Sequence, residues 1–183
     1  MKHYGFLDLE MTCDDKQELP SHKREIISAG LVIADDNYKI KEKYHALIKP
    51  ALYSDISDYC TVLTGIHQND LNHAEDCETV FEIIWKLCLK YSVSKIFVFG
   101  SGDARAIANQ AGINRKINRK TKYMMNVRRR LIDLRPAILA RLHLKSKGNG
   151  LKKIAEYLDV DCKNHHNALH DAETLMKICR KTP

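Results

Sequence analysis

The sequence lacks several features that would assign it to a class at once. Its 183 residues include six cysteines but no C-x-x-C pair, and there is no P-loop, H-E-x-x-H or G-x-S-x-G motif. The longest apolar-rich run, IISAGLVIA at 26–34, is too short to span a bilayer, and the N-terminus has no signal-peptide core. These absences argue against a zinc ribbon, a disulfide framework, a membrane protein and a phosphatase-like enzyme. They predict a cytoplasmic protein with reduced thiols.

Composition and hydrophobic periodicity predict one α/β domain over residues 1–183. Apolar residues make up 44% and charged residues 29% of the chain, which is ordinary for a globular protein of this size. Periodicity predicts strands at 3–11, 25–35, 38–49, 94–100 and 131–134. It predicts helices at 58–63, 67–72, 75–91, 102–111, 135–143, 150–160 and 167–181. Because antiparallel strands come first and β-α alternation follows, we expect a mixed five-stranded sheet flanked by helices.

Basic residues are concentrated in the second half of the chain. The net charge is +7, but residues 104–155 hold fifteen bases and one acid, so they carry +14 and the remainder −7. The densest part, 114–130, has no acid, which suits contact with the phosphates of a polyanion. A solvated face or an import-like signal is the alternative. The bases proposed to touch phosphate are Arg115, Lys116, Arg119, Lys120, Arg128, Arg129 and Arg130.

Two carboxylates lie in the apolar run FLDLEMT at 6–12. Side chains alternate along a strand, so Asp8 and Glu10 point to one face while their apolar neighbours point to the other. Two adjacent anions at the end of a sheet repel each other and are costly to desolvate. We therefore expect a positive partner, either a basic side chain or a metal ion.

Two further acids suggest that the partner is a metal. Asp103 follows the strand predicted at 94–100, and Asp171 lies in the last helix. Alone, Asp103 is explained as a helix N-cap. Together with Asp8 and Glu10, these acids have the composition of a site for a hard cation such as Mg²⁺ or Mn²⁺.

The motifs resemble those of a known family. D-L-E at 8–10, VFGSGDARAI around Asp103, and H-H-N-A-L-H-D at 165–171 are similar to the three motifs of the DEDDh, or DnaQ-like, 3′-to-5′ exonucleases. T-V-L-T-G-I at 61–66 and GLKKIAEYLDV at 150–160 resemble further segments of that family. The set is most similar to the branch of Eri-type RNA exonucleases and KapD-like proteins. The resemblance spans nearly the whole chain and implies an RNase H-like fold.

The resemblance also implies roles for the residues. Asp8 would bridge two divalent cations, Mg²⁺ or Mn²⁺. Glu10 and Asp171 would complete one metal site, and Asp103 would act mainly through a metal-bound water. His166 would be the general base, while its neighbours His165 and His170 compete for that assignment. The residues implied to contact the terminal nucleotide are Met11, Thr12, Leu63, Gly65 and Ile66.

The expected function is metal-dependent 3′-to-5′ exonuclease activity. The substrate would be the 3′ end of single-stranded nucleic acid, with RNA favoured over DNA, and the product nucleoside monophosphates. One alternative is a catalytically inactive RNase H-like module that only binds nucleic acid, although all four acids and the histidine are present. Another is a proofreading DNA exonuclease; the lack of a polymerase-tethering segment after Pro183 argues against it.

Overall fold

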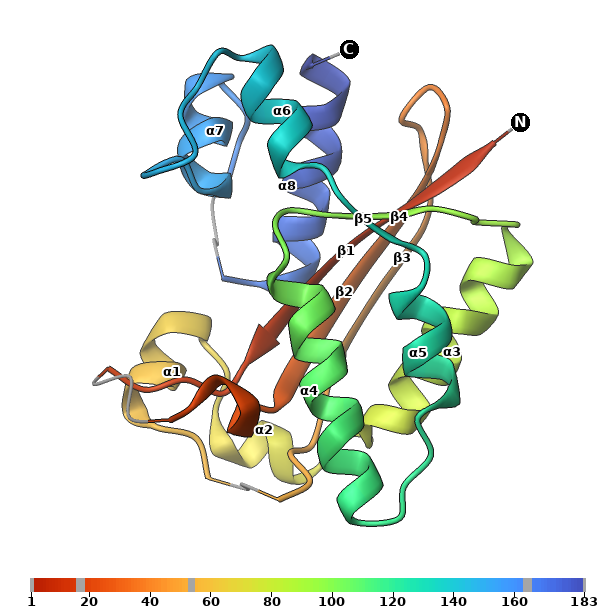
Figure 1. Cartoon of the computed structure of the whole chain (residues 1–183), viewed down its shortest axis with the longest axis vertical. Helices are drawn as coiled ribbons and strands as arrows, with labels where there is room; N and C mark the ends of the chain where they lie inside the picture. Colours follow the sequence, from red (N-terminus) through yellow and green to blue (C-terminus); the bar gives the residue numbers. More distant parts are fainter. Residues whose placement is uncertain (1, 16–18, 53–54, 163–165, 183) are drawn as a thin grey trace.

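The computed structural model describes residues 2–15, 19–52, 55–162 and 166–182, and contains a mixed five-stranded sheet (Figure 1). The strands run in the spatial order β3-β2-β1-β4-β5. They are β1 (His3–Met11), β2 (Ile26–Asp35), β3 (Ile40–Leu47), β4 (Ile96–Val98) and β5 (Leu131–Asp133). The first three pair antiparallel, whereas β4 pairs parallel with both β1 and β5. The predicted sheet is confirmed, and each strand lies within its predicted range.

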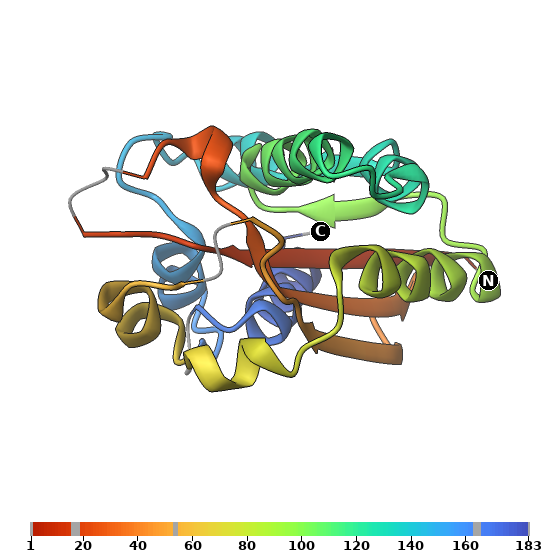
Figure 2. The same cartoon turned by 90° about the horizontal axis from the view of Figure 1, so that it is seen from below.

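Helices cover both faces of this sheet (Figure 2). They are α1 (Asp58–Thr64), α2 (Gln68–Asn72), α3 (Cys77–Lys90), α4 (Gly102–Lys116), α5 (Lys122–Arg128), α6 (Arg135–Arg141), α7 (Leu151–Tyr157) and α8 (Ala168–Lys181), with a short 3₁₀ turn at Ser21–Lys23. Leu7 and Leu9 pack into the core beneath α3, α4 and α5. Phe6 packs into the core on the opposite face, beneath α6, α7 and α8. The central strand β1 therefore separates two apolar cores.

The basic stretch is more helical than predicted. Helix α4 continues beyond 111 to Lys116, and α5 forms in a segment for which no helix was predicted. The predicted end was wrong because Ile113 is buried and extends the packed side of α4. In α5, Met124 and Val127 are buried three residues apart, which is helical spacing among exposed bases.

Helices α1 and α2 lie at the end of the sheet where β1 finishes. A small third core joins Cys60 of α1, Leu71 of α2 and Ile27 of β2. Ser57 caps α1 by accepting the N–H of Cys60, and its hydroxyl donates to the carbonyl of Cys13 at 2.6 Å. These contacts hold α1 against the chain that leaves β1. No helix in the described ranges has the length and apolarity needed to cross a membrane.

Candidate active site

Strand β1 directs Asp8 and Glu10 toward the face covered by α8. Their neighbours Leu7 and Leu9 belong to the opposite core, so the alternation predicted from the sequence is present. Glu10 is buried and Asp8 is half-buried. The two carboxylates thus lie side by side near the end of the central strand, as their spacing of two residues requires.

Helix α4 brings Asp103 to the same strand. Its side chain is buried, and Oδ1 accepts the backbone N–H of Leu9 at 3.1 Å. Leu9 lies between the two strand acids. This hydrogen bond therefore links the second predicted motif directly to the first, although 94 residues separate them in the chain.

Helix α8 supplies Asp171, and its approach to the sheet depends on a glycine. A Cβ added at Gly30, which pairs with Asp8, would lie 2.2 Å from the backbone of Ala168 and Leu169. The start of α8 therefore rests directly on β2, and no larger residue fits between them. A glycine inside a strand pattern signals such a close approach, and here the approach carries Asp171 toward the strand acids.

His166 is fixed just before α8. Its backbone N–H donates to Asp171 Oδ2 at 3.1 Å, and its φ of 68° places it in the left-handed region. Asn167 then caps the helix by accepting the N–H of His170 at 3.2 Å. Of the two competing histidines, His170 has a buried Nδ1 without a hydrogen bond in the described structure. His165 lies outside the described residues.

The acids form one electrostatic unit. Burial raises the pKa of Asp8 well above its ordinary value, and the charges of Asp103, Glu10 and Asp171 raise it further. Burial also raises the pKa of Glu10 to about 8, with Asp171 and Asp103 adding to the effect. Burial raises the pKa of Asp103 to about 7, although the hydrogen bond from Leu9 opposes this. Since carboxylates supply the repulsion felt by Asp8 and Glu10, a cation among them would relieve it.

The geometry of three side chains suits a divalent cation. Ligand atoms of Glu10, His166 and Asp171 all lie within 4.8 Å of one another. Two carboxylates and an imidazole suit borderline and hard metals. Asp8 and Asp103 lie outside this group of three but share its electrostatic field. The group therefore contains two of the four predicted ligands, Glu10 and Asp171, together with His166, which was predicted as the base.

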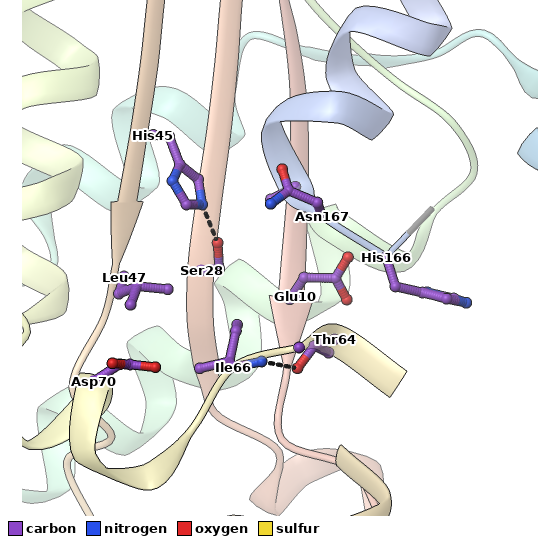
Figure 3. A pocket seen from close by; sticks show the side chains of 11 residues that line it. Glu10, Ser28, His45, Leu47, Thr64, Ile66, Asp70, His166 and Asn167 are labelled. Atoms are coloured by element: carbon purple, nitrogen blue, oxygen red, sulfur yellow. Dashed lines mark hydrogen bonds between the residues drawn. The ribbon is translucent and has the colours of Figure 1, made fainter. Parts of the chain in front are cut away.

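A cavity of about 170 Å³ adjoins the metal-binding group (Figure 3). Glu10 and His166 line it together with Gly65 and Ile66. Gly65 ends α1 with a φ of 71°, a left-handed conformation that turns the chain so that Ile66 reaches the cavity. Two of the residues predicted to contact a nucleotide therefore face the same space as the predicted base.

The other residues predicted to contact the nucleotide lie elsewhere. Leu63 is half-buried in α1 and does not line this cavity. Met11 lines a separate cavity beside α4. The Thr12 hydroxyl is buried and accepts the N–H of Glu25 at 3.0 Å. Of the five residues predicted to contact the nucleotide, the structure therefore places only Gly65 and Ile66 at the cavity that Glu10 lines.

Some residues that line the cavity were not expected from the sequence. His45 of β3 and Ser28 of β2 are hydrogen-bonded at 3.0 Å, side by side on the cavity wall (Figure 3). Asp70 of α2 lines its outer part. The structure pairs Ser28 with Glu10 across β1 and β2, so the two side chains share a face, and this register was not predicted from the sequence.

The predicted phosphate-contacting bases occupy different positions. Arg115, Lys116, Arg119 and Lys120 are exposed around the end of α4, whereas Asp103 lies at its beginning. The rise of an α-helix places the two ends about 20 Å apart. At the end of α5, exposed Arg128 donates to the carbonyl of Ala104 at 3.0 Å, and Arg129 is exposed. Arg130 donates to the carbonyl of Val93 and stacks on the Trp85 ring.

Comparisons with known proteins relate this chain to exonucleases. The family model for RNase T exonucleases matches residues 6–179. The 3′-5′ exonuclease eri1 of Schizosaccharomyces pombe is 29% identical over 93 residues, covering 50% of this chain and 31% of that protein. Human 3′-5′ exoribonuclease 1 is 28% identical over 110 residues, covering 56% and 31%. The matched part therefore spans about a third of each of these two relatives.

Solved structures confirm the predicted fold. The nuclease domain of 3′hExo, a DEDDh family member bound to rAMP, has a TM-score of 0.85 at 20% identity, covering 98% of this chain and 90% of that chain. Cell-death related nuclease 4 has a TM-score of 0.78 at 20% identity, covering 98% and 63%. Both likenesses show the RNase H-like exonuclease fold at low sequence identity.

Proposed function

The chain belongs to the RNase T exonuclease family, and from this membership and its cluster of acids we propose that it is a metal-dependent 3′-to-5′ exonuclease. The membership also confirms the resemblance seen in the motifs. The single observation that carries the proposal is the convergence of Glu10, His166 and Asp171 within 4.8 Å, with Asp8 and Asp103 in the same electrostatic unit.

Two divalent cations, Mg²⁺ or Mn²⁺, would supply Lewis-acid stabilisation of the charge that develops on the scissile phosphate. In our proposal Asp8 would be a ligand to both ions, Glu10 and Asp171 would complete the ligand set, and Asp103 would act through water. His166 accepts the proton of the attacking water as general base. The backbone bond from His166 to Asp171 holds the base beside the ligand set.

The terminal nucleotide would occupy the cavity beside the acids. Gly65 and Ile66 offer it backbone and apolar contacts there. We infer that the substrate is the 3′ end of a single strand and that nucleoside monophosphates are released. RNA is favoured because one relative is named an exoribonuclease and one solved neighbour is bound to rAMP. A proofreading-type DNA exonuclease is the alternative within this class.

The test uses matched single strands of RNA and DNA labelled at the 5′ end. The protein should shorten them stepwise from the 3′ end with Mg²⁺ or Mn²⁺, and chelator should abolish the ladder. Asp8→Ala should be inactive because it removes the proposed bridging ligand. Full activity in chelator or in Asp8→Ala would refute the metal mechanism, whereas strand binding without cleavage would support an inactive nucleic-acid-binding module.

A further inference from the structure

A second group of bases lies on the connection between α6 and α7 and in the first turn of α7. Residues 142–155 contain no acid, and their four lysines are all exposed. None of the four forms an ion pair with a carboxylate in the described ranges. We name this group the lysine surface: Lys145, Lys147, Lys152 and Lys153.

Arg135 holds the backbone of the connection that carries Lys145 and Lys147. Its guanidinium Nη2 donates to the carbonyl of Ser146 at 2.6 Å and to that of Asn149 at 3.4 Å. The Asn149 side chain donates in turn to the carbonyl of Lys145 at 2.6 Å. These bonds order the main chain of the connection while the lysine side chains extend into solvent.

Arg135 is also tied to the turn that leads into α4. The backbone N–H groups of Arg135 and Gly100 both donate to Asp133 Oδ1, at 2.9 and 2.7 Å. Gly100 precedes Asp103 by three residues. The Asp133 carboxylate therefore fastens the start of α6 to the turn that leads into α4, three residues before Asp103.

A cavity of about 390 Å³ lies between that turn and the connection. Gly100 and Ser101 line one side, and Leu144 and Ser146 line the other. The α6–α7 connection lies beside α8, whereas α1 lies beside the end of β1 (Figure 1). A strand whose 3′ end lies at the acids can therefore leave across this cavity toward the lysines.

We propose that the lysine surface binds the backbone phosphates immediately upstream of the 3′-terminal nucleotide, an inference that rests on the exonuclease function proposed above. The matching partner is a single-stranded polynucleotide, because four uncompensated cations on an ordered backbone complement evenly spaced anions. Contacts of this kind are independent of base sequence. The lysine surface would set the affinity for the strand while His166 and the acids carry out the chemistry.

The test replaces all four lysines: Lys145→Ser, Lys147→Ser, Lys152→Ser and Lys153→Ser. A labelled 12-nucleotide RNA is titrated in Ca²⁺ for affinity, and KM and kcat are measured in Mg²⁺. We expect Kd and KM to rise about tenfold near 0.1 M salt, with a much smaller change in kcat. The slope of log affinity against log salt should flatten by up to about 2.8, at roughly 0.7 for each phosphate that a lysine no longer neutralises.

The matched control removes the same charge from lysines outside the proposed path: Lys2→Ser, Lys39→Ser, Lys86→Ser and Lys95→Ser. A lysine-surface variant with the same affinity and salt slope as this control would overturn the inference, and so would a wild-type protein that binds no strand. The p-nitrophenyl ester of thymidine 5′-monophosphate tests the chemistry without upstream phosphates. If wild type binds RNA through these lysines but cleaves neither the ester nor RNA, the proposed exonuclease function is refuted while binding by the lysine surface stands.

Discussion

At the scale of single residues, His166 has two chemical roles open to it. A ring nitrogen lies within 4.8 Å of ligand atoms of Glu10 and Asp171, a distance that suits a third metal ligand. Its position in the resemblance to the DEDDh family implies a general base instead. The two roles differ in what a substitution removes, because a base contributes to rate while a ligand also contributes to metal affinity.

We predict that His166→Ala lowers kcat by about 10²- to 10⁴-fold, the range typical of a general base, and leaves Mn²⁺ and strand binding close to wild type. Kinetics and calorimetric Mn²⁺ titration measure the two quantities separately. His170→Ala is the control and should keep most activity, since His170 is displaced about 100° around the helix from Asp171. Loss of Mn²⁺ affinity in His166→Ala would make His166 a ligand, and an inactive His170→Ala would move the base to that residue.

At the scale of elements, the contact between α8 and β2 positions the third motif. Gly30→Ala would place a methyl group 2.2 Å from the backbone of Ala168 and Leu169, so α8 must move. We expect this overpacking to lower the free energy of unfolding by about 1 to 3 kcal/mol. Mn²⁺ affinity and activity should fall with it, because Asp171 moves with the helix.

Gly112→Ala is the matched control for this substitution. Gly112 lies within α4, and an added Cβ there meets nothing within 4 Å. It should leave metal binding unchanged and raise the free energy of unfolding by about 0.5 to 1 kcal/mol. Thermal melts measure the stability of both variants, and calorimetry measures their Mn²⁺ affinity. Wild-type Mn²⁺ affinity in Gly30→Ala would show that the approach of α8 does not set the site.

Most elements were predictable because their patterns are local. The alternation in β1 is sufficient to place Asp8 and Glu10 on one face, and helical spacing is sufficient for α3. Helix α5 was missed because only Met124 and Val127 are buried among its bases. The convergence of Asp8, Asp103 and Asp171 depends on contacts between distant segments, which periodicity does not encode. The acid composition suggested a cation site, and the resemblance to a family implied that these residues meet there.

At the scale of the whole molecule, the buried acids should make stability depend on pH in the metal-free protein. The folded-state pKa values are raised for Asp8, to about 8 for Glu10 and to about 7 for Asp103. The folded protein therefore holds protons that the unfolded chain releases near pH 4. The stability contributed by protonation is complete below that pH and is lost as pH rises to about 8.

We predict that Tm in chelator falls between pH 5 and pH 8. The free energy of unfolding should fall over this range by at most about 1.4 kcal/mol per pH unit for each proton. Saturating Mg²⁺ should reduce the fall by stabilising the charged acids. Asp8→Asn removes one of the repelling charges, so its Tm should exceed that of wild type at pH 8 and depend less on pH. If Tm depends on pH equally in the two proteins, the acids do not form an electrostatic unit.

The distribution of bases also belongs to this scale. Arg128 and Arg130 already donate to backbone carbonyls, so replacing them would disturb folding as well as binding. Arg115, Lys116, Arg119 and Lys120 are exposed at the end of α4, about 20 Å from Asp103 by helix rise. At about 3.4 Å per stacked phosphate, this distance corresponds to roughly six nucleotides. In Figure 1 the end of α4 lies away from the α6–α7 connection, so these four bases are off the path toward the lysine surface and should contact only strands long enough to reach both.

We predict that replacing these four bases with Ser weakens binding of a 20-nucleotide strand severalfold, equally for different sequences, and flattens its salt dependence. A four-nucleotide strand should be affected much less, because it ends before the far end of α4. Turnover of bound substrate should change little for either length, since the acids and His166 are untouched. Anisotropy titrations at several salt concentrations provide the measurement. An unaltered salt slope for the long strand would mean that these bases only face solvent. An equal loss of affinity for the short strand would mean that the substrate runs along α4 toward them.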